Sequence, residues 1–169
     1  MRSALPFAIA ALLSIPAVAD PSATMRYDGF GPVNVGMSKT AASAALGVEL
    51  ERTNVAGDNE CEYLQAKSGW EGIEFMFSQG VVVRVDVMKG RTATAKGIRI
   101  GDSIAKIRKA YPKRVEVAPH QYIPLPDGKY ISVKSPNGKS AIRFETDKGR
   151  VITYYAGRFP EVEYVEHCL

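Results

Sequence analysis

The chain has 169 residues, a formal net charge of +4 and a hydrophobic share of 46%, a composition typical of an ordinary globular protein. Its lysines and arginines form no dense run backed by aromatic side chains, which argues against a nucleic-acid partner. Beyond the N-terminal segment no hydrophobic stretch is long enough to span a bilayer, so we expect no membrane span in the mature chain.

The N-terminus has the pattern of a signal peptide. A basic start at residues 1–3 is followed by an apolar stretch at residues 4–16 and the small-x-small site Ala17-Val18-Ala19. An uncleaved membrane anchor is disfavoured because the apolar stretch is shorter than the ~20 residues that span a bilayer. We therefore predict cleavage after Ala19 and a mature protein that begins at Asp20, in the periplasm or secreted.

Residues 20–32 form a lead-in with little pattern, and the first of two similar units follows at residues 33–95. Val33 and Val35 predict a short strand. Ser38 is a good N-cap for a helix through Leu46, because its hydroxyl can accept a hydrogen bond from a first-turn amide. Alternation with period two then predicts three antiparallel strands, at residues 61–66, 72–78 and 81–87.

The second unit, at residues 96–157, repeats this order. Ile98-Arg99-Ile100-Gly101-Asp102-Ser103 returns 65 positions after Val33-Asn34-Val35-Gly36-Met37-Ser38, and again opens a short helix. The strands that follow are predicted at residues 129–134, 140–146 and 150–156. We therefore expect an α+β fold of two tandem repeats, each a short helix on a small antiparallel sheet, with residues 158–169 as a tail.

This arrangement resembles the tandem-repeat fold of the β-lactamase inhibitor protein, and one copy is similar to the small outer-membrane-assembly lipoproteins that share the unit. The resemblance rests on the apolar-x-apolar-Gly-x-Ser motif that precedes each helix and covers most of residues 33–157. It implies that the two sheets join into one concave surface and that the activity is the binding of another protein. It does not imply that the target is a β-lactamase.

The two cysteines, Cys61 and Cys168, are expected to form a disulfide, because an exported protein meets an oxidising environment. The bridge would attach the tail to the first repeat. The alternative is a reactive Cys168 with His167 beside it, but adjacent residues rarely present a nucleophile and its base to each other.

Few residues suggest catalysis. The sequence contains no Gly-x-Ser-x-Gly elbow, no P-loop and no dinucleotide fingerprint, and it predicts neither a cofactor nor a metal site. His120 is expected to be a solvated loop residue. The alternative function is a small hydrolase-like enzyme or metal protein that uses His167 and nearby acidic residues such as Glu163 and Glu166.

The strand pattern suggests a binding surface on the sheet face opposite the helices. Alternation places one set of side chains in the core: Ile142, Phe144, Ile152 and Tyr154. The other face keeps apolar and cationic side chains of the kind found in protein interfaces, and we predict it as the partner-binding site: Met76, Arg84, Val151 and Tyr155. The expected function is an exported module with an inhibitor, immunity-type or envelope-assembly role, whose partner is another envelope or secreted protein.

Overall fold

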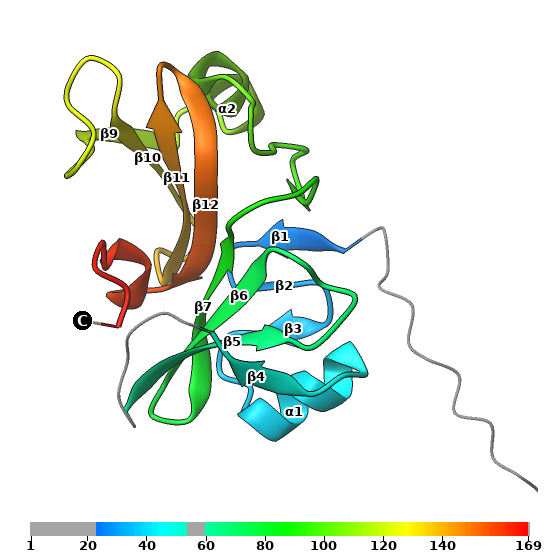
Figure 1. Cartoon of the computed structure of the whole chain (residues 1–169). Helices are drawn as coiled ribbons and strands as arrows, with labels where there is room; N and C mark the ends of the chain where they lie inside the picture. The colour runs from blue at the N-terminus through cyan, green and yellow to red at the C-terminus, as the bar shows by residue number, and fades with distance from the viewer. Residues whose placement is uncertain (1–22, 54–59, 169) are drawn as a thin grey trace, which may run out of the picture.

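The computed structural model describes residues 23–53 and 60–168, so the predicted signal peptide (1–19) lies outside the described residues. Within these ranges the chain forms two α-helices, one 3-10 helix and twelve strands in two sheets (Figure 1), which confirms the expected α+β class. The helices are α1 (Lys39–Leu46), α2 (Ile104–Ala110) and η1 (Glu161–Glu163). The strands are β1 (Thr24–Arg26), β2 (Gly29–Phe30), β3 (Val33–Asn34), β4 (Leu50–Arg52), β5 (Cys61–Ala66), β6 (Ile73–Ser78), β7 (Val81–Val87), β8 (Ala93–Thr94), β9 (Val115–Pro119), β10 (Lys129–Lys134), β11 (Ser140–Asp147) and β12 (Arg150–Arg158).

Eight of the strands form one antiparallel sheet in the order β4-β5-β6-β7-β12-β11-β10-β9. Each predicted repeat supplies four strands in mirrored order, so the two sheets are joined edge to edge, as expected. The join is the pairing of β7 with β12, from Tyr154 opposite Val87 to Gly157 opposite Arg84. A glycine is required at position 157, because a Cβ atom there would lie 2.4 Å from the carbonyl oxygen of Val83.

Each half of the chain opens with a serine-capped helix. The Ser38 hydroxyl accepts a hydrogen bond from the amide of Ala41, and the Ser103 hydroxyl accepts one from the amide of Lys106, both at 3.2 Å. Each serine thereby satisfies a first-turn amide that has no partner within its helix. The predicted N-cap Ser38 is confirmed, and of the two candidates for the second helix, Asp102 and Ser103, the structure has Ser103 as the cap.

The turn before each helix also makes the same contacts in both halves. Residues 36–37 exchange backbone hydrogen bonds with Val82 of β7, and residues 101–102 exchange them with Val151 of β12. Each cap serine also forms an isolated β-bridge to the residue that precedes this valine. Ser38 pairs with Val81 in the first half, and Ser103 pairs with Arg150 in the second. These matching contacts are what a duplicated unit predicts.

Both long hairpins contain a β-bulge, and the bulge in β12 changes which residues face the core. The register of β6–β7 shifts at Val83 and that of β11–β12 shifts at Ile152. An extra residue in one strand reverses the alternation beyond it. The prediction that Ile152 faces the core is therefore wrong: Ile152 is 40% exposed and Val151 is buried instead.

The segment expected as a lead-in is part of the fold. β1 and β2 lie within it and, with β3 and β8, form a small second sheet of order β3-β2-β1-β8, in which β1 pairs in parallel with β8 at the end of the first repeat. Met25 and Phe30 from this sheet are buried in the main core. Strands of two or three residues are too short for their alternation to be recognised in the sequence.

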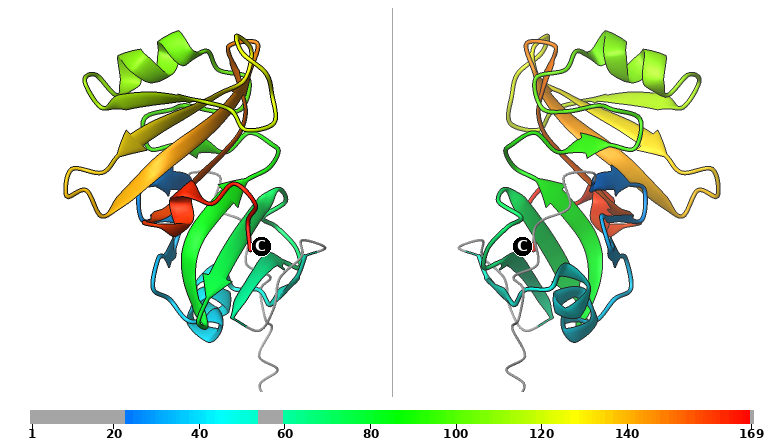
Figure 2. Two further views of the ribbon diagram at one scale, coloured as in Figure 1. Left: turned by 90° about the vertical axis from the view of Figure 1, so that its left-hand side faces the viewer. Right: turned by 90° about the vertical axis from the view of Figure 1, so that its right-hand side faces the viewer.

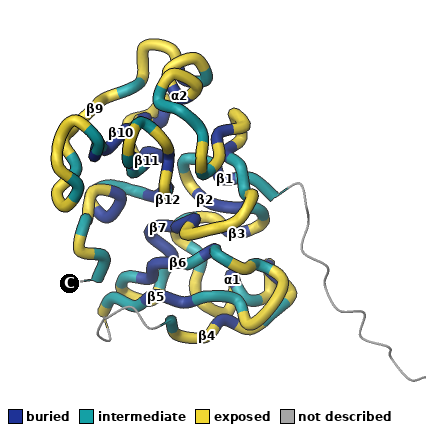
Figure 3. The backbone as a smooth tube through the Cα atoms, turned by 45° about the horizontal axis from the view of Figure 1, so that its top comes forward, coloured by how far each residue is buried: buried dark blue, intermediate teal, exposed yellow. Residues whose placement is uncertain are grey.

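The large sheet is covered on both faces. One hydrophobic core, with buried residues from both repeats, includes side chains of α1 and α2, which lie at opposite ends of the molecule (Figure 2). On the other face the C-terminal tail crosses the β7–β12 join, where η1 contacts β7, β11 and β12. β7 is buried along nearly its whole length, whereas β9 and the loop to β10 are largely exposed (Figure 3). Among the described residues no helix is long and apolar enough to cross a membrane.

Candidate binding site at the C-terminal tail

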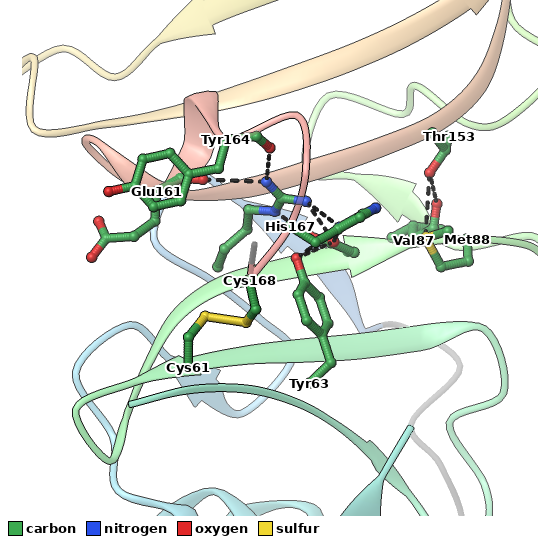
Figure 4. A network of polar contacts seen from close by, with 11 residues as sticks. Cys61, Tyr63, Val87, Met88, Thr153, Glu161, Tyr164, His167 and Cys168 are labelled. Carbon is green, nitrogen blue, oxygen red and sulfur yellow. Dashed lines mark hydrogen bonds and ion pairs between the residues drawn. A yellow bond between two sulfur atoms is a disulfide. The ribbon is translucent and has the colours of Figure 1, made fainter. Parts of the chain in front are cut away.

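The tail is covalently attached to the first repeat. Cys61 at the start of β5 and Cys168 form a disulfide with a Cα–Cα distance of 5.4 Å, across a sequence separation of 107 residues (Figure 4). The predicted disulfide is confirmed, and a role for Cys168 as a free nucleophile is excluded by it. A disulfide of this kind is typical of proteins from oxidising compartments.

The predicted partner-binding face is not exposed. All four of its residues are at most 2% exposed: Met76, Arg84, Val151 and Tyr155. Val151 belongs to the main core, because of the bulge in β12. The others lie beneath the tail, where Met76 packs near Cys168 and Tyr155 packs with Val162. The prediction of an exposed site centred on these residues is therefore wrong, because the tail occupies the face that the helices leave open.

Arg84 and Asp86 form a buried ion pair under the tail. They stand two residues apart on β7 and so project from the same face. Arg84 Nε lies 2.7 Å from Asp86 Oδ1 and Nη2 lies 2.9 Å from Oδ2, with both side chains 1% exposed. The guanidinium carbon also lies 3.9 Å from the ring centroid of Tyr155. Two charges can be buried here because they neutralise each other through two parallel hydrogen bonds, a bidentate ion pair.

The remaining donors of Arg84 hold the tail. Its Nη1 donates to the carbonyl oxygens of Glu161 at 3.2 Å and Tyr164 at 2.7 Å (Figure 4). Its Nη2 lies 3.1 Å from Nδ1 of His167. Because a guanidinium can only donate, Nδ1 of His167 is the acceptor and its ring proton is on Nε2. Arg84 therefore links the sheet to three points of the tail.

The tyrosines around this ion pair remain protonated. Burial raises the pKa of Tyr63, and Asp86, which accepts a hydrogen bond from the Tyr63 hydroxyl at 2.9 Å, raises it further. Burial also raises the pKa of Tyr155. Burial lowers the pKa of Arg84, but the attraction of Asp86 outweighs it, so the guanidinium stays charged. The cluster is thus a closed network whose groups bind one another.

His120 organises the loop that connects β9 to β10. Its Nδ1 accepts hydrogen bonds from the amides of Tyr122 and Ile123, both at 3.1 Å, so the proton is on Nε2, which lies 3.2 Å from Glu145 Oε2. The ring stacks on Tyr130 with centroids 4.4 Å apart. The His120 side chain is only 5% exposed. The expectation of a solvated loop histidine is wrong, because one ring satisfies two loop amides and a carboxylate.

A cleft of about 300 Å³ lies between this loop and the end of the tail. Tyr122 on its rim is 59% exposed. The cleft combines aromatic rings with two carboxylates and is lined by His120, Tyr122, Tyr130, Glu145, Val165, Glu166 and His167. The sequence did indicate its two histidines as separate features, but it gave no sign that the loop and the tail meet.

The alternative chemistry based on His167 finds little support in this geometry. Within the described part of the chain, no three His, Cys, Asp or Glu side chains gather in a way that could hold a metal ion. Nδ1 of His167 faces Arg84 and the Tyr63 hydroxyl, and the acidic group near it is Asp86, at 3.8 Å, rather than Glu163 or Glu166. Both histidines therefore act here as parts of hydrogen-bond networks.

The hydroxyl of Tyr155 provides a test of this packing. Its oxygen is buried and has no hydrogen-bond partner among the described residues. Because a buried polar atom without a partner is destabilising, Tyr155→Phe is expected to leave the free energy of unfolding unchanged or to raise it by up to ~1 kcal/mol. Urea unfolding of both proteins measures this difference. A clear loss of stability would show that the hydroxyl has a partner and that the tail packs differently.

Comparison with known proteins shows the fold alone. No protein-family model and no curated protein matches the chain. Among solved structures, that of the uncharacterized protein YfeY from Escherichia coli is similar, with a TM-score of 0.51 and 14% sequence identity, over 80% of this chain and 99% of that one. The chain therefore shares a distant fold similarity with a protein that is itself described as uncharacterized.

Proposed function

We propose that this chain is an exported binding module, periplasmic or secreted, that engages another envelope or secreted protein through the cleft between the β9–β10 loop and the tail. The observation that carries the proposal is that both walls of the cleft are fixed from inside the fold. Arg84 and the Cys61–Cys168 disulfide hold the tail, and His120 holds the loop. A site that is already ordered loses less conformational entropy when a partner binds.

The lining of the cleft suggests which part of a partner it receives. Its volume suits one or two side chains rather than a large cofactor. Glu145 and Glu166 contribute negative charge beside the exposed ring of Tyr122, while Nδ1 of each histidine is occupied by a hydrogen bond within the fold. Carboxylates next to an aromatic ring favour a cationic side chain. We therefore expect a lysine or arginine of the partner to enter the cleft.

The resemblance to the β-lactamase inhibitor type of fold supports a binding role but not the same binding surface. Two capped helices and one continuous antiparallel sheet are present in the described residues, as that resemblance implies. In the resembling fold the open sheet face grips the partner. Here the tail occupies that face at the join of the repeats, so the partner is expected at the edge of the tail instead.

Site-specific photo-crosslinking in producing cells tests the proposal. A photoreactive residue in place of Tyr122 is expected to give a discrete adduct with an envelope or secreted protein. The same residue in place of Thr40, which is exposed on α1 in the other repeat, is expected to give none. Equal adducts from both positions would mean that the contact is non-specific.

A pair of charge variants sharpens this test. Glu163 and Glu166 are both exposed acidic residues of the tail, but only Glu166 lines the cleft. Glu166→Arg should therefore reduce the Tyr122-position adduct strongly, by repelling a cationic side chain, while Glu163→Arg leaves it unchanged. Equal effects of the two variants, or none from either, would contradict the proposed site.

A further inference from the structure

The positive charge of the chain is concentrated in one segment. Residues 99–116, which contain α2 and the start of β9, carry six lysines and arginines against two acidic residues, a surplus of four. The whole chain also has a net charge of +4, so the remaining residues are balanced. A surplus confined to a tenth or so of a chain produces a local positive potential rather than a general one.

The two acidic residues of this segment are already paired. Asp102 lies 2.8 Å from Lys106, and Glu116 lies 3.0 Å from Lys134. Of the five cations that remain in the segment, Arg99 precedes α2, and the four in α2 and the turn after it form what we call the α2 basic patch. All four are exposed, and none has an ion-pair partner among the described residues: Arg108, Lys109, Lys113 and Arg114.

Exposed apolar side chains lie at the same end of the molecule. Leu125, in the β9–β10 loop between two prolines, is 62% exposed, and Val117 in β9 is 44% exposed. Figures 1 and 2 place this loop and α2 at one end of the molecule, away from α1, with β9 running between them. The loop that presents Leu125 is held in place, because the His120 ring accepts hydrogen bonds from the loop amides of Tyr122 and Ile123.

We propose that this end of the protein docks on the surface of an anionic lipid bilayer. The α2 basic patch would lie against the lipid phosphates, and Leu125 would enter the boundary between headgroups and acyl chains. Each basic residue near an anionic bilayer contributes a similar increment of electrostatic attraction. An apolar side chain that enters the bilayer contributes hydrophobic binding energy as well, which a soluble polyanion does not provide. An exposed leucine at the same end of the molecule as a basic patch therefore favours lipid over an anionic polymer. This inference does not depend on the cleft.

Co-sedimentation of the mature protein with vesicles tests the proposal. Vesicles of equal parts phosphatidylglycerol and phosphatidylcholine should bind the protein at low salt, with binding weakened by high salt, while pure phosphatidylcholine vesicles should not. Lys113→Gln/Arg114→Gln should bind about thirty-fold more weakly, since two of the four cations are removed. Lys39→Gln/Lys89→Gln makes the same charge change at exposed positions elsewhere and should bind like the wild type.

Leu125→Ser separates a lipid surface from other anions. It should weaken vesicle binding and leave retention on heparin unchanged. Thermal unfolding of each variant checks that the fold is intact, which is expected because every replaced side chain is exposed. The proposal fails if the wild-type protein does not sediment with phosphatidylglycerol vesicles, if the two double variants bind equally, or if Leu125→Ser leaves vesicle binding unchanged.

Discussion

Arg84→Ala is expected to lower the free energy of unfolding by about 3–5 kcal/mol. The substitution leaves the Asp86 carboxylate, which is 1% exposed, buried without its cation, and removing one member of a buried ion pair has effects of this size. It also removes the donors that hold the carbonyl oxygens of Glu161 and Tyr164. Urea unfolding followed by circular dichroism gives the difference directly.

Two controls separate burial from the loss of an arginine as such. Arg52→Ala removes a similar arginine–carboxylate contact, to Glu62, but with the arginine side chain 55% exposed, and should lower the stability by less than about 1 kcal/mol. Arg84→Met with Asp86→Leu removes both charges and should be less destabilised than Arg84→Met alone. If Arg84→Ala proves as mild as Arg52→Ala, the ion pair is not buried as described.

Removal of the disulfide by Cys61→Ala with Cys168→Ala is expected to lower the free energy of unfolding by about 4–5 kcal/mol. The bridge closes a loop of 107 residues, and in the chain-entropy model a loop of that length restricts the unfolded chain by this amount. Urea unfolding of the oxidised wild type and the double variant measures the loss.

Wild-type protein unfolded in the presence of a reductant provides the matched comparison. It should match the double variant, because both lack the cross-link while the tail keeps its hydrogen bonds to Arg84. A double variant as stable as the oxidised protein would mean that the native contacts of the tail, rather than the cross-link, determine its attachment.

The parts of the fold that depend on local chemistry could be predicted from the sequence. Ser38 and Ser103 are N-caps because a side-chain hydroxyl at that position reaches a free amide, which needs no knowledge of the rest of the chain. The hairpins followed from period-two alternation around short turns. The disulfide followed from an even cysteine count in a chain whose N-terminus predicts export.

The binding face could not be predicted, because it depends on contacts between distant segments. A bulge adds one residue without a distinctive signature, and it exchanged the faces of Val151 and Ile152. The tail was expected only as an attached end, and its position over Tyr155 arises from the tertiary fold. The alternation of Arg84 and Asp86 with valines along β7 predicts a strand with one solvated face, so it indicated exposure where the pair is in fact buried.

The central claim is that the tail packs on the sheet face and forms one wall of the cleft, and nuclear Overhauser contacts in the oxidised mature protein test it most directly. We predict cross-peaks between Val162 methyl groups and the Tyr155 ring, and between the rings of His167 and Tyr63, whose centroids lie 5.3 Å apart. Sharp tail resonances at random-coil positions, without these cross-peaks, would contradict the claim and leave the face opposite the helices open.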